Sequence, residues 1–78
     1  MKIMNIKEEV YQEIKKIIGD DVNFNDDSLF NEDLGIDSYK AVTILLNLDK
    51  KKITFKNEDL PSVKSIKDLL NVLVYYGE

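Results

Sequence analysis

The segment Gly35-Ile36-Asp37-Ser38-Tyr39-Lys40-Ala41-Val42 decides how this chain is interpreted. A glycine and a carboxylate precede a serine at the point where an apolar pattern of helical period begins, which predicts a helix that starts at Ser38. The serine hydroxyl would then lie at an exposed corner, beside main-chain N–H groups without partners and the positive end of the helix. A phosphate ester on Ser38 would be stabilised by those groups.

Outward from this segment, apolar residues recur at helical spacing on both sides. The stripe Ile3, Ile6, Val10, Ile14, Ile17 and Ile18 predicts a helix over residues 5–18, with Asn5 and Glu8 as a capping box and Gly19 as its stop. The helix that starts at Ser38 should run to about Lys51, with Ala41, Leu45 and Leu48 in the core. A short helical turn is expected at Asn57–Leu60, before Pro61.

Ser65 should cap a last helix that runs to about Tyr76 and is ended by Gly77. The residues expected to face inward there are Ile66, Leu69, Leu70, Leu73 and Val74. Because no strand-like alternation persists, we expect an all-α four-helix bundle, with three main helices and one short helix, in a single domain over residues 1–78.

Residues 19–36 predict a long ordered loop, rich in Asp, Asn and Ser. Its expected apolar anchors are Val22, Phe24, Leu29, Phe30 and Leu34. Asp21, Asn23, Asn25, Asp27 and Glu32 also fall at the ligand positions of an EF-hand loop. Asp26 stands where that loop needs glycine, and no second loop is seen, so we favour Asp21, Asp27 and Glu32 as candidates for weak divalent-ion binding. A small calcium-binding helical protein that uses the 21–32 loop is the alternative.

Composition restricts the classes of function. The chain has 78 residues and neither histidine nor cysteine, so it has no neutral-pH proton shuttle and no thiol, which counts against most enzymes. Its net charge is −4 and every basic residue is lysine, which argues against DNA binding, including a helix-turn-helix mode. No apolar run approaches the roughly 18 residues of a membrane span and no signal peptide is evident. We expect a cytoplasmic monomer that binds neither nucleic acid nor membrane.

The order of these features resembles the acyl carrier protein family, including its peptidyl carrier relatives, over nearly the whole chain. The family motif L-G-x-D-S matches Leu34-Gly35-Ile36-Asp37-Ser38. A bare G-x-D-S is common at loop-to-helix junctions, where Asp37 or Ser38 would be only an N-cap, but the chain length, the preceding loop and the following helix all match the family as well.

The resemblance implies that Ser38 carries 4′-phosphopantetheine, added from coenzyme A by a phosphopantetheinyl transferase, with Gly35 and Asp37 supporting the motif. It further implies an acyl carrier that is not itself an enzyme and works with acyl-transferring, ligase or synthase enzymes of fatty acid, polyketide or related biosynthesis. An aminoacyl or peptidyl carrier of a nonribosomal-peptide pathway is the alternative. The acyl chain would lie in the bundle, for which the candidate lining residues are Ile44, Leu48, Ile53, Phe55 and Leu60.

In this family the second helix binds the partner enzymes and is usually acidic. The partner-contact candidates here are Asp37, Tyr39, Lys40, Val42 and Leu46. Lys40 and Thr43 stand at positions that are commonly acidic, and Lys50, Lys51 and Lys52 follow Asp49. We interpret the lysine run as a favourable, solvated helix end. The lysine content predicts a specialised pathway rather than the main fatty acid carrier, with ordinary fatty acid synthesis as the alternative.

Overall fold

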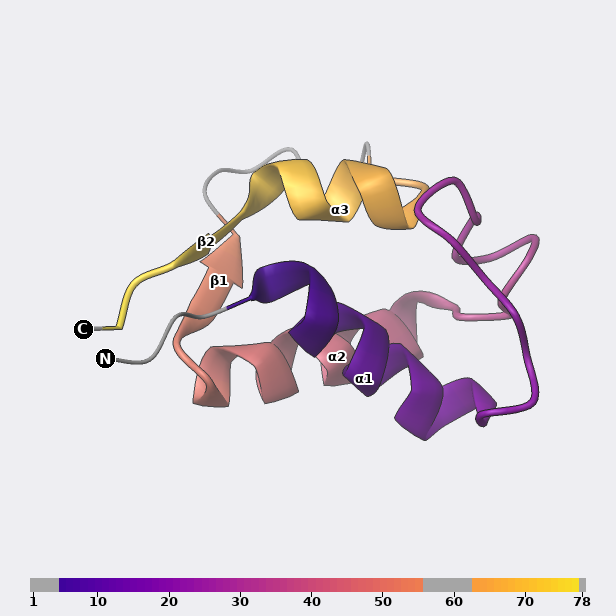
Figure 1. Ribbon diagram of the computed structural model, residues 1–78, viewed down its shortest axis with the longest axis horizontal. Coiled ribbons are helices and arrows are strands. Elements are labelled where there is room, and N and C mark those ends of the chain that lie inside the picture. Colours follow the sequence, from indigo (N-terminus) through magenta and orange to yellow (C-terminus); the bar gives the residue numbers. More distant parts are fainter. Residues whose placement is uncertain (1–4, 56–62, 78) are drawn as a thin grey trace.

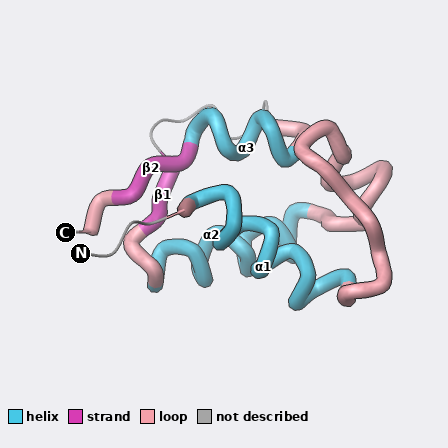
Figure 2. Tube along the Cα trace, in the orientation of Figure 1, coloured by secondary structure: helices cyan, strands magenta, loops and turns pink. Residues whose placement is uncertain are grey.

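The computed structural model describes residues 5–55 and 63–77 and shows a mostly helical fold with a small sheet at one end (Figure 1). In chain order the elements are α1 (Ile6–Ile18), α2 (Ser38–Lys50), β1 (Ile53–Phe55), α3 (Ile66–Val72) and β2 (Leu73–Tyr75). Helices α1 and α2 lie side by side and run in roughly opposite directions (Figures 1 and 2). Of the helices in the described part of the chain, none combines the length and hydropathy that a membrane crossing requires.

The predicted limits of the first two helices are confirmed. The Asn5 side chain accepts a hydrogen bond from the Glu8 N–H, and Gly19 ends α1 at a positive φ of 93°. Asp37 caps α2, which begins at Ser38 and ends at Lys50. Leu48 is buried as expected, whereas Ala41 and Leu45 are half-buried and pack against the core. The core joins residues of all five elements to Leu34 and Ile36 of the loop.

The prediction of a helix reaching Tyr76 is wrong. Helix α3 ends at Val72, and Leu73 turns into extended backbone with φ −87° and ψ 143°. Leu73 is the first residue of β2, which pairs antiparallel with β1 in the register Ile53↔Tyr75 and Phe55↔Leu73. The chain is therefore not all-α. In Leu73–Tyr75, whose residue types favour strands, hydrogen bonds to β1 replace the helical hydrogen bonds that were expected.

The packing of this C-terminal region follows from the change in backbone. Of the residues expected to face inward, Ile66, Leu69 and Leu73 are buried, whereas Leu70 and Val74 are half-buried. The helical turn expected at Asn57–Leu60 lies outside the described residues, so the count of four helices stays a prediction.

The loop between α1 and α2 is fastened to the start of α3 by main-chain hydrogen bonds. These run from Phe30 N to Lys64 O (2.9 Å), from Ile66 N to Ser28 O (3.1 Å) and from Lys67 N to Asp26 O (2.8 Å). Leu34 is buried and Phe24, Leu29 and Phe30 are half-buried, so four predicted anchors are confirmed; Val22 is exposed. Because residues 26–30 of the loop are held in this way, the Gly35–Ser38 segment that follows is placed at the start of α2.

A buried charge network joins α1 to the end of α2. The Glu13 carboxylate is 1% exposed and accepts hydrogen bonds from Lys16 Nζ (3.0 Å) and from Asn47 Nδ2 (3.1 Å). Lys51 Nζ lies 3.0 Å from Glu13 and 2.6 Å from Glu9. Burial alone would raise the pKa of Glu13, but the hydrogen bonds and charges of Lys16 and Lys51 outweigh it and hold that pKa below its usual value.

The interpretation of the lysine run as a solvated helix end is therefore wrong for Lys51. The hydrogen bond to Glu9, together with the bond to Glu13, outweighs partial burial and raises the pKa of Lys51. The side chains of its two neighbours, Lys50 and Lys52, are exposed. One lysine of the run thus holds two helices together, and the other two face solvent.

Candidate functional site

The backbone before Ser38 is fixed by three residues with different roles. Gly35 has φ +65°, and no atom lies within 4 Å of the place where a Cβ would stand, so glycine is needed there for its conformation rather than for space. Ile36 is 2% exposed and its N–H donates to Phe30 O at 2.7 Å, which pins the chain to the core one residue before the cap. The predicted supporting role of Gly35 thus has a clear geometric basis.

Asp37 shapes the first turn of α2. Its carboxylate accepts the Lys40 N–H at 3.0 Å, and its carbonyl accepts the Ala41 N–H at 2.9 Å. The Asp37 carbonyl is the first acceptor of the helix and it bonds to the Ala41 N–H, so the N–H groups of Ser38 and Tyr39 have no intrahelical partner. The exposed Ser38 side chain therefore lies beside main-chain donors and the positive end of the helix dipole.

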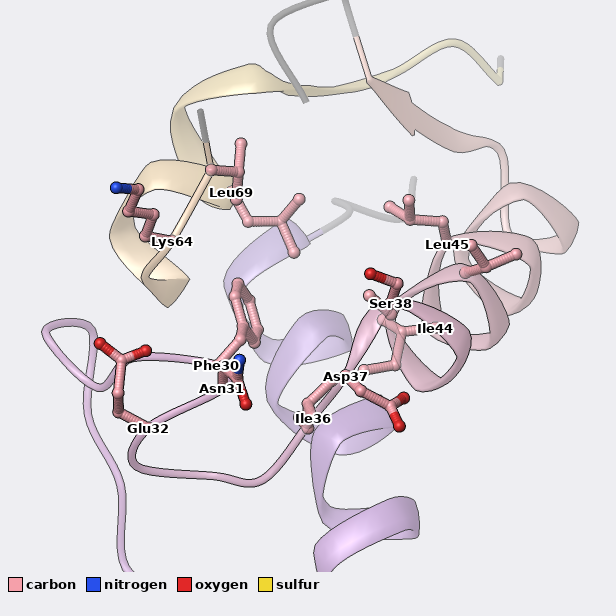
Figure 3. A pocket seen from close by; sticks show the side chains of 13 residues that line it. Phe30, Asn31, Glu32, Ile36, Asp37, Ser38, Ile44, Leu45, Lys64 and Leu69 are labelled. Atoms are coloured by element: carbon pink, nitrogen blue, oxygen red, sulfur yellow. The ribbon is translucent and has the colours of Figure 1, made fainter. Parts of the chain in front are cut away.

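A pocket of about 610 Å³ opens directly beside Ser38. Ser38 and Asp37 lie on one side of it, Glu32 and Lys64 lie across from them, and Phe30, Ile36 and Leu69 lie between (Figure 3). The described apolar residues that line it are Phe30, Ile36, Ala41, Val42, Ile44, Leu45, Val63 and Leu69. An apolar interior with a polar rim suits a ligand that has a hydrophobic body and a polar attachment point.

The pocket differs from the space predicted for an acyl chain. Ile44 does line it, but Leu48 and Ile53 are fully buried in the core cluster. Phe55 borders a separate groove, and Leu60 lies outside the described residues. Besides α2, the walls come from the loop before it and from the region of Val63, Lys64 and Leu69. Of these added walls, the sequence indicated only the loop anchor Phe30.

The partner-contact candidates are accessible. Tyr39, Val42 and Leu46 have exposed fractions of 78%, 52% and 61%, which is unusual for large apolar side chains, and Asp37 and Lys40 are also exposed. The first turn of α2 contains no acidic residue, apart from the Asp37 cap that precedes it.

The candidate metal ligands are not gathered into a site. Within residues 5–55 and 63–77, no three acidic side chains come close enough to hold an ion, so Asp21, Asp27 and Glu32 form no such group. A neighbouring carboxylate has a role that the sequence did not indicate: Asp26 accepts a hydrogen bond from the Tyr11 hydroxyl at 2.6 Å and pairs with Lys7 at 3.2 Å. This carboxylate stabilises the loop against α1.

Comparisons with known proteins agree with this geometry. A family model described as "Phosphopantetheine attachment site" matches residues 8–73. The acyl carrier protein of Rickettsia bellii is 30% identical to this chain, over 92% of the chain and 91% of that protein. The acyl carrier protein of Chloroherpeton thalassium is 31% identical over 95% of each, and that of Petrotoga mobilis is 26% identical over 86% of each. No solved structure matches.

Proposed function

The chain belongs to the family of phosphopantetheine attachment proteins, and from that membership we propose that Ser38 is its attachment residue. The function is that of a carrier protein, and the cofactor is 4′-phosphopantetheine. The observation that carries the assignment of Ser38 is its place: an exposed hydroxyl at the first position of α2, after a glycine with positive φ and a capping aspartate, and beside an apolar pocket.

The residues at this place fit the group. A phosphodiester on the Ser38 hydroxyl would lie near the N–H groups of Ser38 and Tyr39, which the helix leaves without partners. The Asp37 carboxylate is directed to the Lys40 N–H, so it holds the turn rather than occupying those two donors. Nothing needs to move to admit the group, since Ser38 is exposed.

When bound, the group supplies a flexible arm whose thiol holds acyl groups as thioesters. The chain itself supplies the anchor at Ser38 Oγ, the turn fixed by Gly35 and Asp37, and an apolar surface close by. With no histidine or cysteine, the given sequence has neither a neutral-pH proton shuttle nor a thiol of its own. We propose that residues 1–78 form one domain that partner enzymes act on, and that is not an enzyme.

Mass spectrometry tests the attachment residue. The full chain, incubated with coenzyme A and a broad-specificity phosphopantetheinyl transferase, should gain the mass of one arm. Ser38→Ala should abolish the gain, whereas the matched control Thr43→Ala, which removes an exposed hydroxyl from the same helix, should leave it unchanged. The assignment would be refuted if Ser38→Ala gained the arm, or if two different transferases both failed to modify the wild-type chain.

We further propose that an acyl chain carried on Ser38 enters the pocket lined by Phe30, Ile36 and Leu69. Burial should contribute about 0.8 kcal/mol per methylene, so thermal stability should rise with acyl length until the pocket is full. Holo protein loaded with a series of saturated acyl groups tests this, with Phe30→Ser as the variant that should flatten the rise. NMR shifts that stay at the surface around Ser38 for every length would contradict burial and favour a short acyl or aminoacyl cargo.

The proposed partners are a phosphopantetheinyl transferase and the acyl-transferring, ligase or synthase enzymes of one pathway, with contacts at Asp37, Tyr39, Lys40, Val42 and Leu46. The lysines of α2 support a specialised pathway rather than housekeeping fatty acid synthesis. Malonyl loading of the holo protein by a fatty acid pathway transferase should therefore be slow and should improve in Lys40→Glu. Loading as fast as that of a housekeeping carrier would defeat this part of the proposal.

A further inference from the structure

One side of the pocket beside Ser38 is built from two chain segments that are joined as one unit. Loop residues 26–30 and residues 64–67 at the start of α3, which together we name the pocket wall, lie antiparallel to each other. Their main chains are joined by three hydrogen bonds, which link Phe30 to Lys64, Ile66 to Ser28 and Lys67 to Asp26. Phe30 and Lys64 of this wall line the pocket. The two segments should therefore move together if either is displaced.

The pocket lies between this wall and α2. Figure 3 shows Leu45 of α2 across the pocket from Phe30 and Lys64. Helix α2 is itself fixed to α1, because the charge network around Glu13 joins the two helices. With α2 held in this way, the width of the pocket depends on how the pocket wall is held to α1.

The Asp26 carboxylate supplies the directional contacts between the pocket wall and α1. It accepts a hydrogen bond from the Tyr11 hydroxyl at 2.6 Å and pairs with Lys7 Nζ at 3.2 Å. Among the described residues, no other hydrogen bond or ion pair joins the wall to α1. The wall is also attached through the core, where Ile66 is buried in one cluster with Ile14 of α1. Apolar burial is non-directional, so the bond to Tyr11, which has a defined geometry, sets where the wall stands.

We infer that Asp26 is a positioning residue for the carried acyl chain: its bond to Tyr11 holds the pocket wall to α1 and keeps Phe30 in contact with the chain. The inference rests on the proposed entry of an acyl chain into this pocket. A methylene group between α2 and a fixed wall is covered on both sides, whereas a displaced wall leaves one side to water. Loss of the bond should therefore reduce the stabilisation that each added methylene contributes.

Melting temperatures of the full chain, loaded with saturated acyl groups of increasing length, measure this contribution. Each variant is compared with its own holo form, so that a general loss of stability cancels. Tyr11→Phe removes the hydroxyl and keeps the ring, which packs against Phe24 with centroids 4.8 Å apart. In this variant the rise in melting temperature per methylene should fall to about half of the wild-type rise, as for a methylene covered on one side only. Asp26→Ala should have the same effect.

Tyr76→Phe is the matched control. It removes a hydrogen bond of the same kind, from the Tyr76 hydroxyl to the Asp49 carboxylate at 3.1 Å, at the end of the fold that contains the sheet (Figure 1). The rise per methylene should be unchanged in this variant. Nuclear Overhauser effects between the acyl chain and the Phe30 ring should be present in the wild type and in Tyr76→Phe, and weaker in Tyr11→Phe. Circular dichroism of each variant establishes that it is folded.

A wild-type rise per methylene that persists in Tyr11→Phe and Asp26→Ala overturns the inference and leaves the entry of the acyl chain intact. An equal fall in Tyr76→Phe overturns it as well, because the effect would then not belong to the pocket wall. A wild-type melting temperature that does not change with acyl length refutes both the inference and the proposed entry. None of these results bears on the attachment residue, since arm attachment at Ser38 is read by mass.

Discussion

Replacing Lys51 by methionine should destabilise the fold more than a surface change would. The substitution leaves the Glu13 carboxylate, 1% exposed, without one of its three hydrogen-bond donors. Breaking a buried ion pair costs about 3–5 kcal/mol when the remaining charge has no other partner. Lys16 and Asn47 keep their bonds to Glu13, so we expect a loss of about 2 kcal/mol in the free energy of unfolding. A 78-residue domain has roughly 4–12 kcal/mol in total, so the variant should stay folded.

Urea unfolding followed by circular dichroism at pH 7 measures this loss. Lys50→Met is the matched control, because it removes the neighbouring lysine, which is exposed, and should change stability by less than about 0.5 kcal/mol. Adding Glu13→Gln to Lys51→Met should recover part of the loss, since the buried charge is then gone. Equal effects of Lys51→Met and Lys50→Met would refute the assignment of Lys51 as a structural cation.

The same network sets a pH window. The pKa of Glu13 is lowered in the folded state. The contribution of Glu13 to folding stability is therefore complete above pH 4.5, the pKa of the unfolded chain, and is lost as the pH falls through the lower folded-state pKa. The pKa of Lys51 is raised, so its contribution is complete below 10.5 and is lost as pH rises through the higher folded value. The stability difference between wild type and Lys51→Met should therefore be flat between these limits and shrink outside them.

Three other perturbations test separate parts of the fold. Gly35→Ala should cost about 1–2 kcal/mol in thermal unfolding and slow arm attachment, because alanine is strained at φ +65°; an unchanged melting temperature would contradict this. Ser65→Ala should cost about 1 kcal/mol by removing the cap of α3, whereas Ser65→Asp, which can still cap, should cost less. The pKa of Tyr11 is raised to about 12, first by burial and then by the hydrogen bond to Asp26. An NMR titration of Tyr11 should therefore have its midpoint near 12, and the midpoint should fall toward 10.0 in Asp26→Asn. A wild-type midpoint near 10.0 would count against the hydrogen bond.

The local elements of this protein could be predicted because their signals lie within a few residues. Asn5 and Gly19 bound α1, and Asp37 sets the start of α2, through hydrogen bonds or backbone angles that span no more than four positions. The same short range made Ser38 recognisable as an exposed hydroxyl at a helix start. Periodicity of 3.6 residues then identified most of the buried face.

The tertiary structure decided the features that join distant parts of the chain. Leu73 continues the apolar period of α3 and would be buried in either a helix or a strand. Its pairing with Phe55 of β1 is what makes it the start of a strand. Lys50 and Lys51 are the same residue type at adjacent positions, yet about 100° of helical rotation puts one in solvent and the other against Glu9 and Glu13. The pocket beside Ser38 arises in the same way, since its walls come from segments held together by loop-to-helix hydrogen bonds. Such contacts depend on which partner the folded chain brings near, and a local sequence pattern carries no information about that partner.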